Sequence, residues 1–305
     1  MAHELHSRTL HRSGVVVIRD VQCRAPRGDG PTDECGTSDD IVFPRRGAFV
    51  RHARGQAAFG DANAILFFNG GEPYRVTHPT DGGDDCTVLT FSAGVLADAF
   101  PARLAGAPAG AAPAFPRAEA PGDSRGFATL QRLRRLLAAG PACPVRGDEV
   151  ALSLLAGAAA ALAVRREHPG RRLRPATARA HRGTAFATRA LLARDFAQRL
   201  TLDRIATAVN SSPFHLARLF ARETGLPIHR HLARLRLREA LERLAAGEDD
   251  LTTLALDLGF SSHAHFTDAF RREFGMPPSH FRRGLTSARR REMSKILEAA
   301  RGPRG

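Results

Sequence analysis

The first hundred residues alternate short apolar runs with turn residues. The runs are rich in β-branched and aromatic residues and include VVVIRDVQC, DIVFP, AILFF and CTVLTFS, which lie between Gly14 and Ser92. Segments such as NGGEP and PTDGGDD separate them, and no stretch with helical periodicity interrupts the series. Strands at this spacing, bounded by Gly, Asp and Pro, predict an antiparallel β-sandwich or small barrel over residues 1–100.

The next segment, residues 101–168, is predicted to combine a linker with a pair of helices. Residues 101–123 are rich in Pro and Ala, which is typical of a linker. Two helical patterns follow, the second over about residues 148–166. The apolar positions on one face are Phe127, Leu130, Leu133 and Leu137 in the first and Leu152, Leu155, Ala159 and Leu162 in the second. The pair either covers the sheet alone or also forms a dimer interface.

After an interdomain linker at residues 169–183, residues 184–283 look wholly helical and contain one plan twice. The copies are NSSPFHLARLFARETGLP, from Asn210, and FSSHAHFTDAFRREFGMP, from Phe260. In each copy a short amphipathic helix precedes a turn with two serines, and a second helix then runs to a glycine. Two short helices joined by a tight turn form a helix-turn-helix, whose second helix enters the major groove of DNA.

A single long helix is predicted between the two copies. Its sequence is IHRHLARLRLREALERLAA, residues 228–246, and its length is roughly 28 Å at about 1.5 Å per residue. One turn of DNA is about 34 Å long. A rigid helix of this length is suited to holding two reading helices in successive major grooves on one face of the duplex.

Charge is distributed unevenly along the chain. Of the formal net charge of +14, residues 1–100 carry −3, residues 179–283 carry +6, and residues 284–305, which we expect to be a flexible basic tail, carry +4. A basic C-terminal half beside a mildly acidic N-terminal half indicates a polyanionic partner for the C-terminal half only.

The apolar runs and the cysteines exclude several classes of protein. The N-terminal sequence MAHELHSRTLHRSG has no apolar core, so we expect no signal peptide. The longest apolar run, ALSLLAGAAAALAV, is too short to span a bilayer, and we expect a soluble, cytoplasmic protein. The four cysteines, Cys23, Cys35, Cys86 and Cys143, show no C-x-x-C pairing, so a disulfide framework is not expected.

The duplicated segment resembles a known family. The run LTTLALDLGFSSHAHFTDAFRREFGMPPSHFRR, residues 251–283, resembles nearly throughout the signature of the DNA-binding domain of AraC/XylS-type transcription regulators, and the resemblance extends over residues 184–283. The strand-rich N-terminal part is similar, in pattern and architecture, to the cupin-type sensor half of many members. The resemblance implies an α+β two-domain protein. Its N-terminal domain would be an antiparallel, cupin-like β-sandwich or barrel with a helical pair, and its C-terminal domain all-α with two helix-turn-helix units.

The resemblance also implies which residues meet DNA. The base-reading positions are Phe214, His215, Ala217 and Arg218 in the first recognition helix and His263, Ala264, Thr267 and Asp268 in the second. Phosphate contacts are expected at Ser212, Arg222, Ser262, Arg271 and Arg272.

Three of these positions leave alternatives open. Arg218 is the best candidate for direct readout, because a guanidinium bonds guanine O6 and N7 together, and a solvated or phosphate-facing role is the alternative. His215 and its counterpart His265 either read DNA or pack locally. Asp268 stands where the family commonly has a basic residue, so it either accepts from a cytosine N4 amino group or marks a helix that contacts DNA loosely.

Two sites are weighed in the N-terminal part. Four residues near a predicted barrel mouth either meet an anionic or polar effector or form structural salt bridges; they are Arg51, Tyr74, Arg75 and His78. A second set, of types that bind zinc or respond to oxidants, is Cys23, Cys35, Cys86 and His78. Its spacing is not diagnostic, and buried, unreactive thiols are the better interpretation. The H-x-H pair that marks cupin metalloenzymes is absent from this part, so we expect no metal and no cofactor.

These features together predict a sequence-specific, effector-responsive transcription regulator and not an enzyme. The expected partners are double-stranded DNA, RNA polymerase, an unknown small-molecule effector and a second copy of the chain in a homodimer, with no membrane. One alternative is a constitutive regulator whose N-terminal domain is purely structural. Two others are a cupin metalloenzyme, opposed by the missing H-x-H, and a DNA-repair methyltransferase, opposed by the missing close-spaced cysteine quartet and PCH-type nucleophile.

Overall fold

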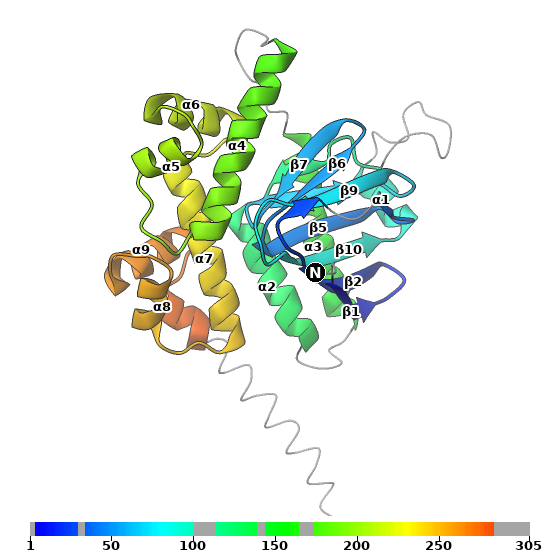
Figure 1. The fold of residues 1–305 in the computed structure, drawn as a ribbon. Coiled ribbons are helices and arrows are strands. Elements are labelled where there is room, and N and C mark those ends of the chain that lie inside the picture. Colours follow the sequence, from blue (N-terminus) through cyan, green and yellow to red (C-terminus); the bar gives the residue numbers. More distant parts are fainter. Residues whose placement is uncertain (1–3, 30–33, 101–113, 139–143, 165–173, 284–305) are drawn as a thin grey trace, which may run out of the picture.

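A β-rich domain and a helical domain lie side by side in the computed structural model (Figure 1). The structure describes residues 4–29, 34–100, 114–138, 144–164 and 174–283. The expected basic tail and part of each predicted linker lie outside these ranges. Within them, no helix combines the length and the apolar character needed to cross a membrane.

Two antiparallel sheets form the N-terminal domain, as predicted. The larger sheet has the order β1 (Glu4–Arg12), β2 (Val16–Arg24), β10 (Asp84–Phe91), β5 (Asp40–Gly47), β8 (Ala64–Phe68) and β11 (Glu119–Pro121). The smaller sheet has the order β3 (Gly28–Asp29), β9 (Pro73–His78), β6 (Phe49–Ala53) and β7 (Gln56–Gly60), and β4 (Glu34–Cys35) also pairs with β9.

The central strands of the larger sheet, β5, β8 and β10, are buried on both faces. Their residues Val42, Leu66 and Val88 pack with Phe49 of the smaller sheet. Their neighbours on the other face pack against helices α2 (Ser124–Ala138) and α3 (Pro144–Ala163); these neighbours are Ile41, Phe43, Ile65, Phe67 and Leu89. Because successive side chains of a strand point to opposite faces, strands buried on both sides read as continuous apolar runs such as AILFF.

Three elements of this domain differ from the prediction. Strand β1 has a mostly exposed, polar sequence that carries no apolar signal, and β11 lies in the segment predicted as a linker. The short helix α1 (Ala93–Ala99) follows β10 directly.

The apolar face predicted for α3 is only partly confirmed, since Leu155 and Leu162 are buried but Leu152 is not. The helix begins at Pro144, and Leu152 is 39% exposed. The residues that α3 buries are Ala151, Leu154, Leu155, Ala158 and Leu162. Alanines around most of the helix leave its sequence without one strongly apolar face, so periodicity alone does not fix its rotation.

Six helices form the described part of the C-terminal domain. They are α4 (Pro175–Asp195), α5 (Leu202–Ala208), α6 (Pro213–Thr224), α7 (Ile228–Ala246), α8 (Leu251–Asp257) and α9 (His263–Phe274). The prediction of one helix over residues 228–246 is confirmed at both ends. Residues 175–183, predicted as linker, are instead the first turns of α4. Pro175 stands at the first helical position, where a missing amide hydrogen costs nothing, so it starts the helix.

Helix α7 is the centre of the helical core. Its leucines pack with Phe220 of α6 and with Phe266 and Phe270 of α9. The same apolar cluster includes Ala62 and Phe127 of the β-rich domain. The core of the helical domain therefore continues across the domain boundary.

A carboxylate of the β-rich domain binds two residues of the helical domain; we call Asp61, Arg189 and His231 the Asp61 cluster. Asp61 is fully buried and accepts a hydrogen bond from Nε of Arg189, on α4, at 2.9 Å. Its Oδ2 also lies 3.1 Å from Nε2 of His231, on α7. Burial opposes the charge of Asp61, but Arg189 and His231 hold its pKa below the usual value. Burial lowers the pKa of His231, so the imidazole is neutral at pH 7 and donates to Asp61.

A carboxylate of α7 makes the reciprocal contact. Buried Glu242 lies 3.1 Å from guanidinium nitrogens of both Arg45, on β5, and Arg134, on α2. The neighbouring Glu239 accepts two hydrogen bonds from Arg46, at 2.8 and 2.7 Å. Each domain thus inserts a carboxylate among basic side chains of the other.

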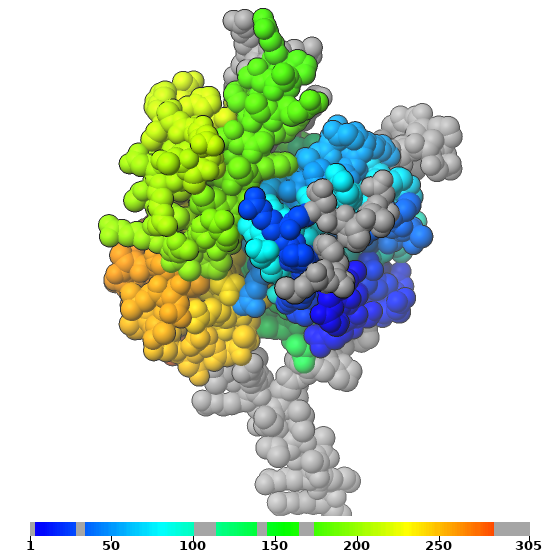
Figure 2. All heavy atoms as spheres, in the orientation of Figure 1, coloured from blue at the N-terminus to red at the C-terminus, as the bar shows by residue number. Residues whose placement is uncertain are grey.

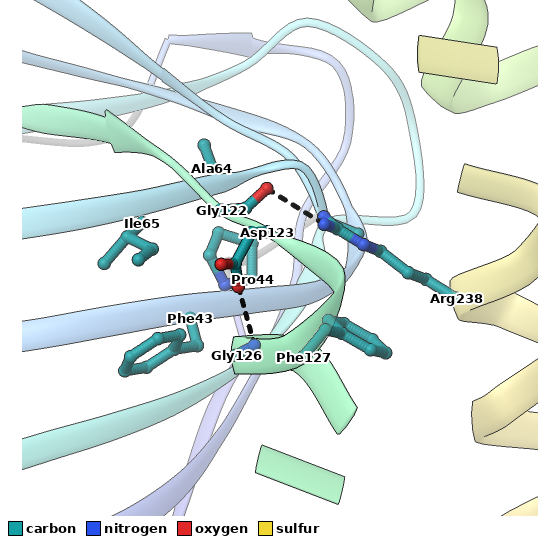
Figure 3. Close-up of a pocket in the computed structure, with 10 residues that line it drawn as sticks. Phe43, Pro44, Ala64, Ile65, Gly122, Asp123, Gly126, Phe127 and Arg238 are labelled. Carbon is teal, nitrogen blue, oxygen red and sulfur yellow. Dashed lines mark hydrogen bonds between the residues drawn. The ribbon is translucent and has the colours of Figure 1, made fainter. Parts of the chain in front are cut away.

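Arg238 of α7 also enters the β-rich domain, next to a small cavity (Figure 3). Its Nη2 donates to the carbonyl oxygen of Gly122 at 3.0 Å, and its guanidinium carbon lies 5.1 Å from the ring centre of Phe127. Burial lowers the pKa of Arg238 to about 10, so the side chain is charged at neutral pH. The cavity of about 20 Å³ has room for roughly one water molecule and not for an effector.

Candidate nucleic-acid interface and inter-sheet cavity

Helices α5 and α6 form a first helix pair, and α8 and α9 form a second; α6 and α9 have the same caps. Ser212 and Ser262 each accept a hydrogen bond from the backbone N–H three residues later, at 3.3 and 3.1 Å. Gly225 and Gly275 end α6 and α9 with φ angles of 76° and 77°, which favour glycine. The predicted helix starts and stops are therefore confirmed in both copies.

The tight turn of the second pair requires a glycine at Gly259. Its φ is 77°, and a Cβ atom there would lie 2.5 Å from the carbonyl oxygen of Ala197. The Arg236 guanidinium donates to the carbonyl oxygens of Gly259 and Phe196, both at 2.7 Å. These contacts fix the second pair to the end of α4.

The outer face of α6 combines an exposed aromatic ring with a cation. Phe214 is 73% exposed, and the guanidinium carbon of Arg218 lies 5.6 Å from its ring centre. His215 is exposed with its ring 5.7 Å from that of His181 on α4, and Ala217 is half-buried. Phe214 and Arg218 thus lie on the side opposite buried Leu216 and Phe220, with His215 and Ala217 at the two edges of this outer face.

The outer face of α9 carries a different charge pattern. His263, Ala264 and Asp268 are exposed, and Thr267 is half-buried. Asp268 accepts from Nη2 of Arg271 at 3.0 Å, so the two charges compensate each other one turn apart. This face is available to a partner but offers less positive charge than that of α6.

The residues predicted to contact phosphate differ in their local roles. Ser212 and Ser262 act as helix caps, whose hydroxyl hydrogens remain available for donation. Arg222 pairs with Glu223 at 2.9 Å and contacts His181. Arg272 is exposed on the last turn of α9. His265 bonds Ser261 at 2.9 Å and packs against the Phe260 ring, which supports local packing.

A cavity of about 280 Å³ lies between the two sheets of the β-rich domain. Apolar residues line most of it, among them Val21, Val42, Phe49, Phe68, Val76 and Val88. Strand β9 alternates, so Tyr74 and His78 line this cavity, whereas Arg75 faces a separate hollow beside His52. Arg51 is buried and pairs with Glu72 at 2.7 Å. Only Tyr74 and His78 of the four effector candidates therefore line the cavity.

The same cavity gathers part of the predicted cysteine set. Cys23, Cys86 and His78 line it, together with Asp84, which was not among the residues predicted from the sequence. Asp84 Oδ1 lies 2.9 Å from His78 Nε2, and Asp84 Oδ2 accepts from the Cys86 thiol at 3.0 Å. Burial opposes the charge of His78, but bonds to Asp84 and Cys23 raise its pKa to about 9; burial raises the pKa of Cys86.

Cys35 does not belong to this group. It lies on β4 opposite Pro73, at the end of β9 distant from His78. Five residues of strand separate the two positions by roughly 16 Å. Asp84 directly follows a Gly-Gly turn and begins the buried strand β10, and this position was the only signal for it in the sequence.

Comparison with known proteins identifies the helical segment. Residues 205–284 match the family described as helix-turn-helix domain. Over 89 residues, 29% of this chain, the sequence is 38% identical to the HTH-type transcriptional activator RhaS of Escherichia fergusonii. RhaS of Escherichia coli O157:H7 matches to the same extent. The chain spans about a third of the length of these curated relatives, 32%.

Solved structures of similar proteins add little. ToxT from Vibrio cholerae O395 is 10% identical over 92% of this chain and 98% of that chain, with a TM-score of 0.34. The C-terminal domain of AraT, a response regulator from Geobacillus stearothermophilus, is 29% identical over 37% of this chain and 88% of that chain, with a TM-score of 0.30. TM-scores of this size do not establish a shared fold. The sequence matches, by contrast, identify α5 to α9 as similar to the helix-turn-helix domain of transcriptional activators.

Proposed function

We propose that the protein is a sequence-specific transcription regulator that binds double-stranded DNA through its two helix pairs. The observation that carries the proposal is the pair of outward helix faces, α6 and α9, that α7 holds apart. Figure 1 shows the first helix pair beside one end of α7 and the second beside the other. At roughly 28 Å, α7 approaches the length of one DNA turn, about 34 Å, so both faces suit successive major grooves.

The side chains on these faces suit different parts of DNA. Arg218 presents a guanidinium, which can bond guanine bidentately, and the neighbouring Phe214 ring supplies an apolar contact of the kind made with a thymine methyl group. Arg271 and Arg272 on α9 suit phosphate contacts. We assign base reading and phosphate contacts to the residues predicted from the sequence.

The regulatory part of the proposal concerns the β-rich domain. An effector would bind in the 280 Å³ cavity, whose apolar wall and few polar groups are typical of small-molecule sites. Its binding would shift the populations of domain or dimer arrangements and thereby DNA affinity or contact with RNA polymerase. The exposed face of α3 would contribute to a homodimer.

The test is selection of DNA by the purified full chain from a random library, followed by binding measurements at several salt concentrations. We expect one enriched motif with half-sites about one helical turn apart and an affinity that falls steeply with salt. Retention of all sequences alike, or retention that does not depend on salt, would contradict the proposal.

A further inference from the structure

Three metal-ligating side chains converge at the wall of the inter-sheet cavity. Cys23 lies on β2, Asp84 lies directly opposite it on β10, and His78 ends β9 in the other sheet. One ligand atom of each, a thiol sulfur, a carboxylate oxygen or an imidazole nitrogen, lies within 4.8 Å of the other two. Residues far apart in the sequence thus bring three kinds of ligand to one point.

The turn between His78 and Asp84 is fixed against Cys23. Gly83 has a φ of 74°, and a Cβ atom there would lie 2.0 Å from the carbonyl oxygen of Cys23. The preceding glycine, Gly82, donates its N–H to the carbonyl oxygen of Ala25 at 3.1 Å. The three ligands are therefore held by packed backbone, and little reorganisation is needed to use them.

Burial and hydrogen bonding orient the ligands. His78 and Asp84 are buried, and Cys23 is half-buried and lines the cavity, through which an ion can enter. The Cys86 thiol donates to Asp84 Oδ2 and leaves Oδ1 beside His78. Outer partners of this kind fix the orientation of ligating carboxylates and imidazoles.

We propose that Cys23, His78 and Asp84 bind a thiophilic divalent transition-metal ion, for which zinc is the best match. Thiolate sulfur, imidazole nitrogen and carboxylate oxygen are the three ligand types of zinc, at about 2.0–2.3 Å, and ligand atoms within 4.8 Å of one another need only small shifts to reach those distances. Cys23 and His78 each lose a proton to solvent on binding, because the metal takes a thiolate and a neutral imidazole. The fourth position faces the cavity and takes water or a ligand.

This assignment differs from the cysteine set predicted from the sequence. Asp84 replaces Cys35, and Cys86 positions Asp84 without ligating the metal. Since His78 belongs to the smaller sheet and the other two ligands to the larger one, a bound ion joins the two sheets. An ion that binds only the folded chain also raises its melting temperature.

The experiment is a titration of the metal-depleted full chain with Co²⁺, which reports a thiolate ligand by a charge-transfer band, followed by displacement with Zn²⁺. We expect one Co²⁺ per chain, the thiolate band, and full displacement by Zn²⁺. Cys23→Ser should lose the band and bind metal at least tenfold more weakly, whereas the matched variant Cys35→Ser should retain both properties. Cys86→Ala should retain the band with affinity lowered by about 10- to 100-fold.

Three results would overturn the site. They are no stoichiometric Co²⁺ binding by the wild-type chain, a band that survives Cys23→Ser, and a band lost equally in Cys35→Ser. Circular dichroism of each variant separates loss of a ligand from loss of the fold, and His78→Gln provides a second ligand test if Cys23→Ser is unfolded. These measurements involve no DNA, so they test the metal site independently of the proposed function.

Discussion

The two helix pairs have the same local plan but are attached to the β-rich domain in different ways. Fifty residues separate His231 and Phe281, which occupy equivalent positions after the two copies. His231 packs against the Phe220 ring of the first pair and binds buried Asp61. Phe281 packs against Phe270 of the second pair and lies beneath the half-buried Arg135 guanidinium of α2, 4.6 Å from ring centre to carbon.

Residues that recur in both copies therefore have a different role from residues that occur in one copy only. Repeated serines, phenylalanines and glycines give both pairs the same caps and cores. Residues that differ between the copies decide the charge of the outer faces and the strength of attachment. Figure 2 shows the consequence for the whole molecule, since both pairs project from the β-rich domain on one side and leave their outer surfaces open.

Removing the buried carboxylate of Asp61 should have the largest effect on stability, because this carboxylate attaches the first pair to the β-rich domain. Asp61→Ala removes the buried carboxylate from Arg189, which keeps only the Phe59 carbonyl oxygen and the more distant Glu119 at 3.8 Å, and should lower the free energy of unfolding by about 3–5 kcal/mol. Glu273→Ala, which removes the half-buried carboxylate of the second pair from Arg234 and Ser124, should cost under about 1 kcal/mol. Urea denaturation of the full chain measures both values, and equal losses would contradict the difference in attachment.

Removing one charge from each outer face should affect DNA binding differently in the two pairs. If the proposed function holds, Arg218→Ala should lose about 1–3 kcal/mol of discrimination at one base position. Asp268→Ala frees Arg271 from its intrahelical ion pair and should strengthen binding to all sequences slightly. Arg8→Ala, which removes an exposed charge from β1, is the control. Competition binding against single-base variants of the selected motif measures these effects, and the pattern would be refuted by equal discrimination in Arg218→Ala and Arg8→Ala.

Acidification should weaken the attachment of the first pair specifically. The pKa of His231 is lowered from 6.5 in the folded chain, so the unfolded chain binds this proton at higher pH. Stability should therefore decline as the pH falls below about 6.5, by at most about 1.4 kcal/mol per pH unit for one group. His231→Gln should flatten the slope, measured by denaturation between neutral pH and about pH 5, whereas substitution of exposed His229 should not.

The helix caps should give the smallest and most equal effects. Ser212→Ala and Ser262→Ala each remove a cap bond to a backbone N–H and should each cost about 1 kcal/mol. Thermal denaturation of the two variants measures this. Losses that differ severalfold would show that the shared sequence plan does not give the pairs equal local stability.

The sequence predicted elements wherever local chemistry determines them. Ser212 with Pro213 and Gly225 defines both ends of α6, and the strands near Val42 and Leu66 are visible as apolar runs. Strand β1 was missed because pairing with β2, and not an apolar face of its own, determines it.

Contacts between residues that are far apart in the sequence could not be predicted from it. Asp61 meets Arg189 and His231 across 128 and 170 positions of sequence, and Asp84 meets Cys23 through strand register. No periodicity or spacing rule links such pairs. The predicted cysteine set therefore contains two of the three proposed ligands, Cys23 and His78, together with Cys35, which lies away from them.

The Asp61 cluster limits how freely the two domains can be exchanged between proteins. In isolation, the helical domain exposes Arg189 and His231 to water, which solvates them well. A chimaera that joins this domain to another β-rich domain would bury both without an acid, and Glu242 would lose its cations from β5 and α2. A chimaera that folds must therefore keep Asp61, Arg45 and Arg134 together with the helices. The boundary at which the two domains can be exchanged thus passes through the β-rich domain and not along the linker.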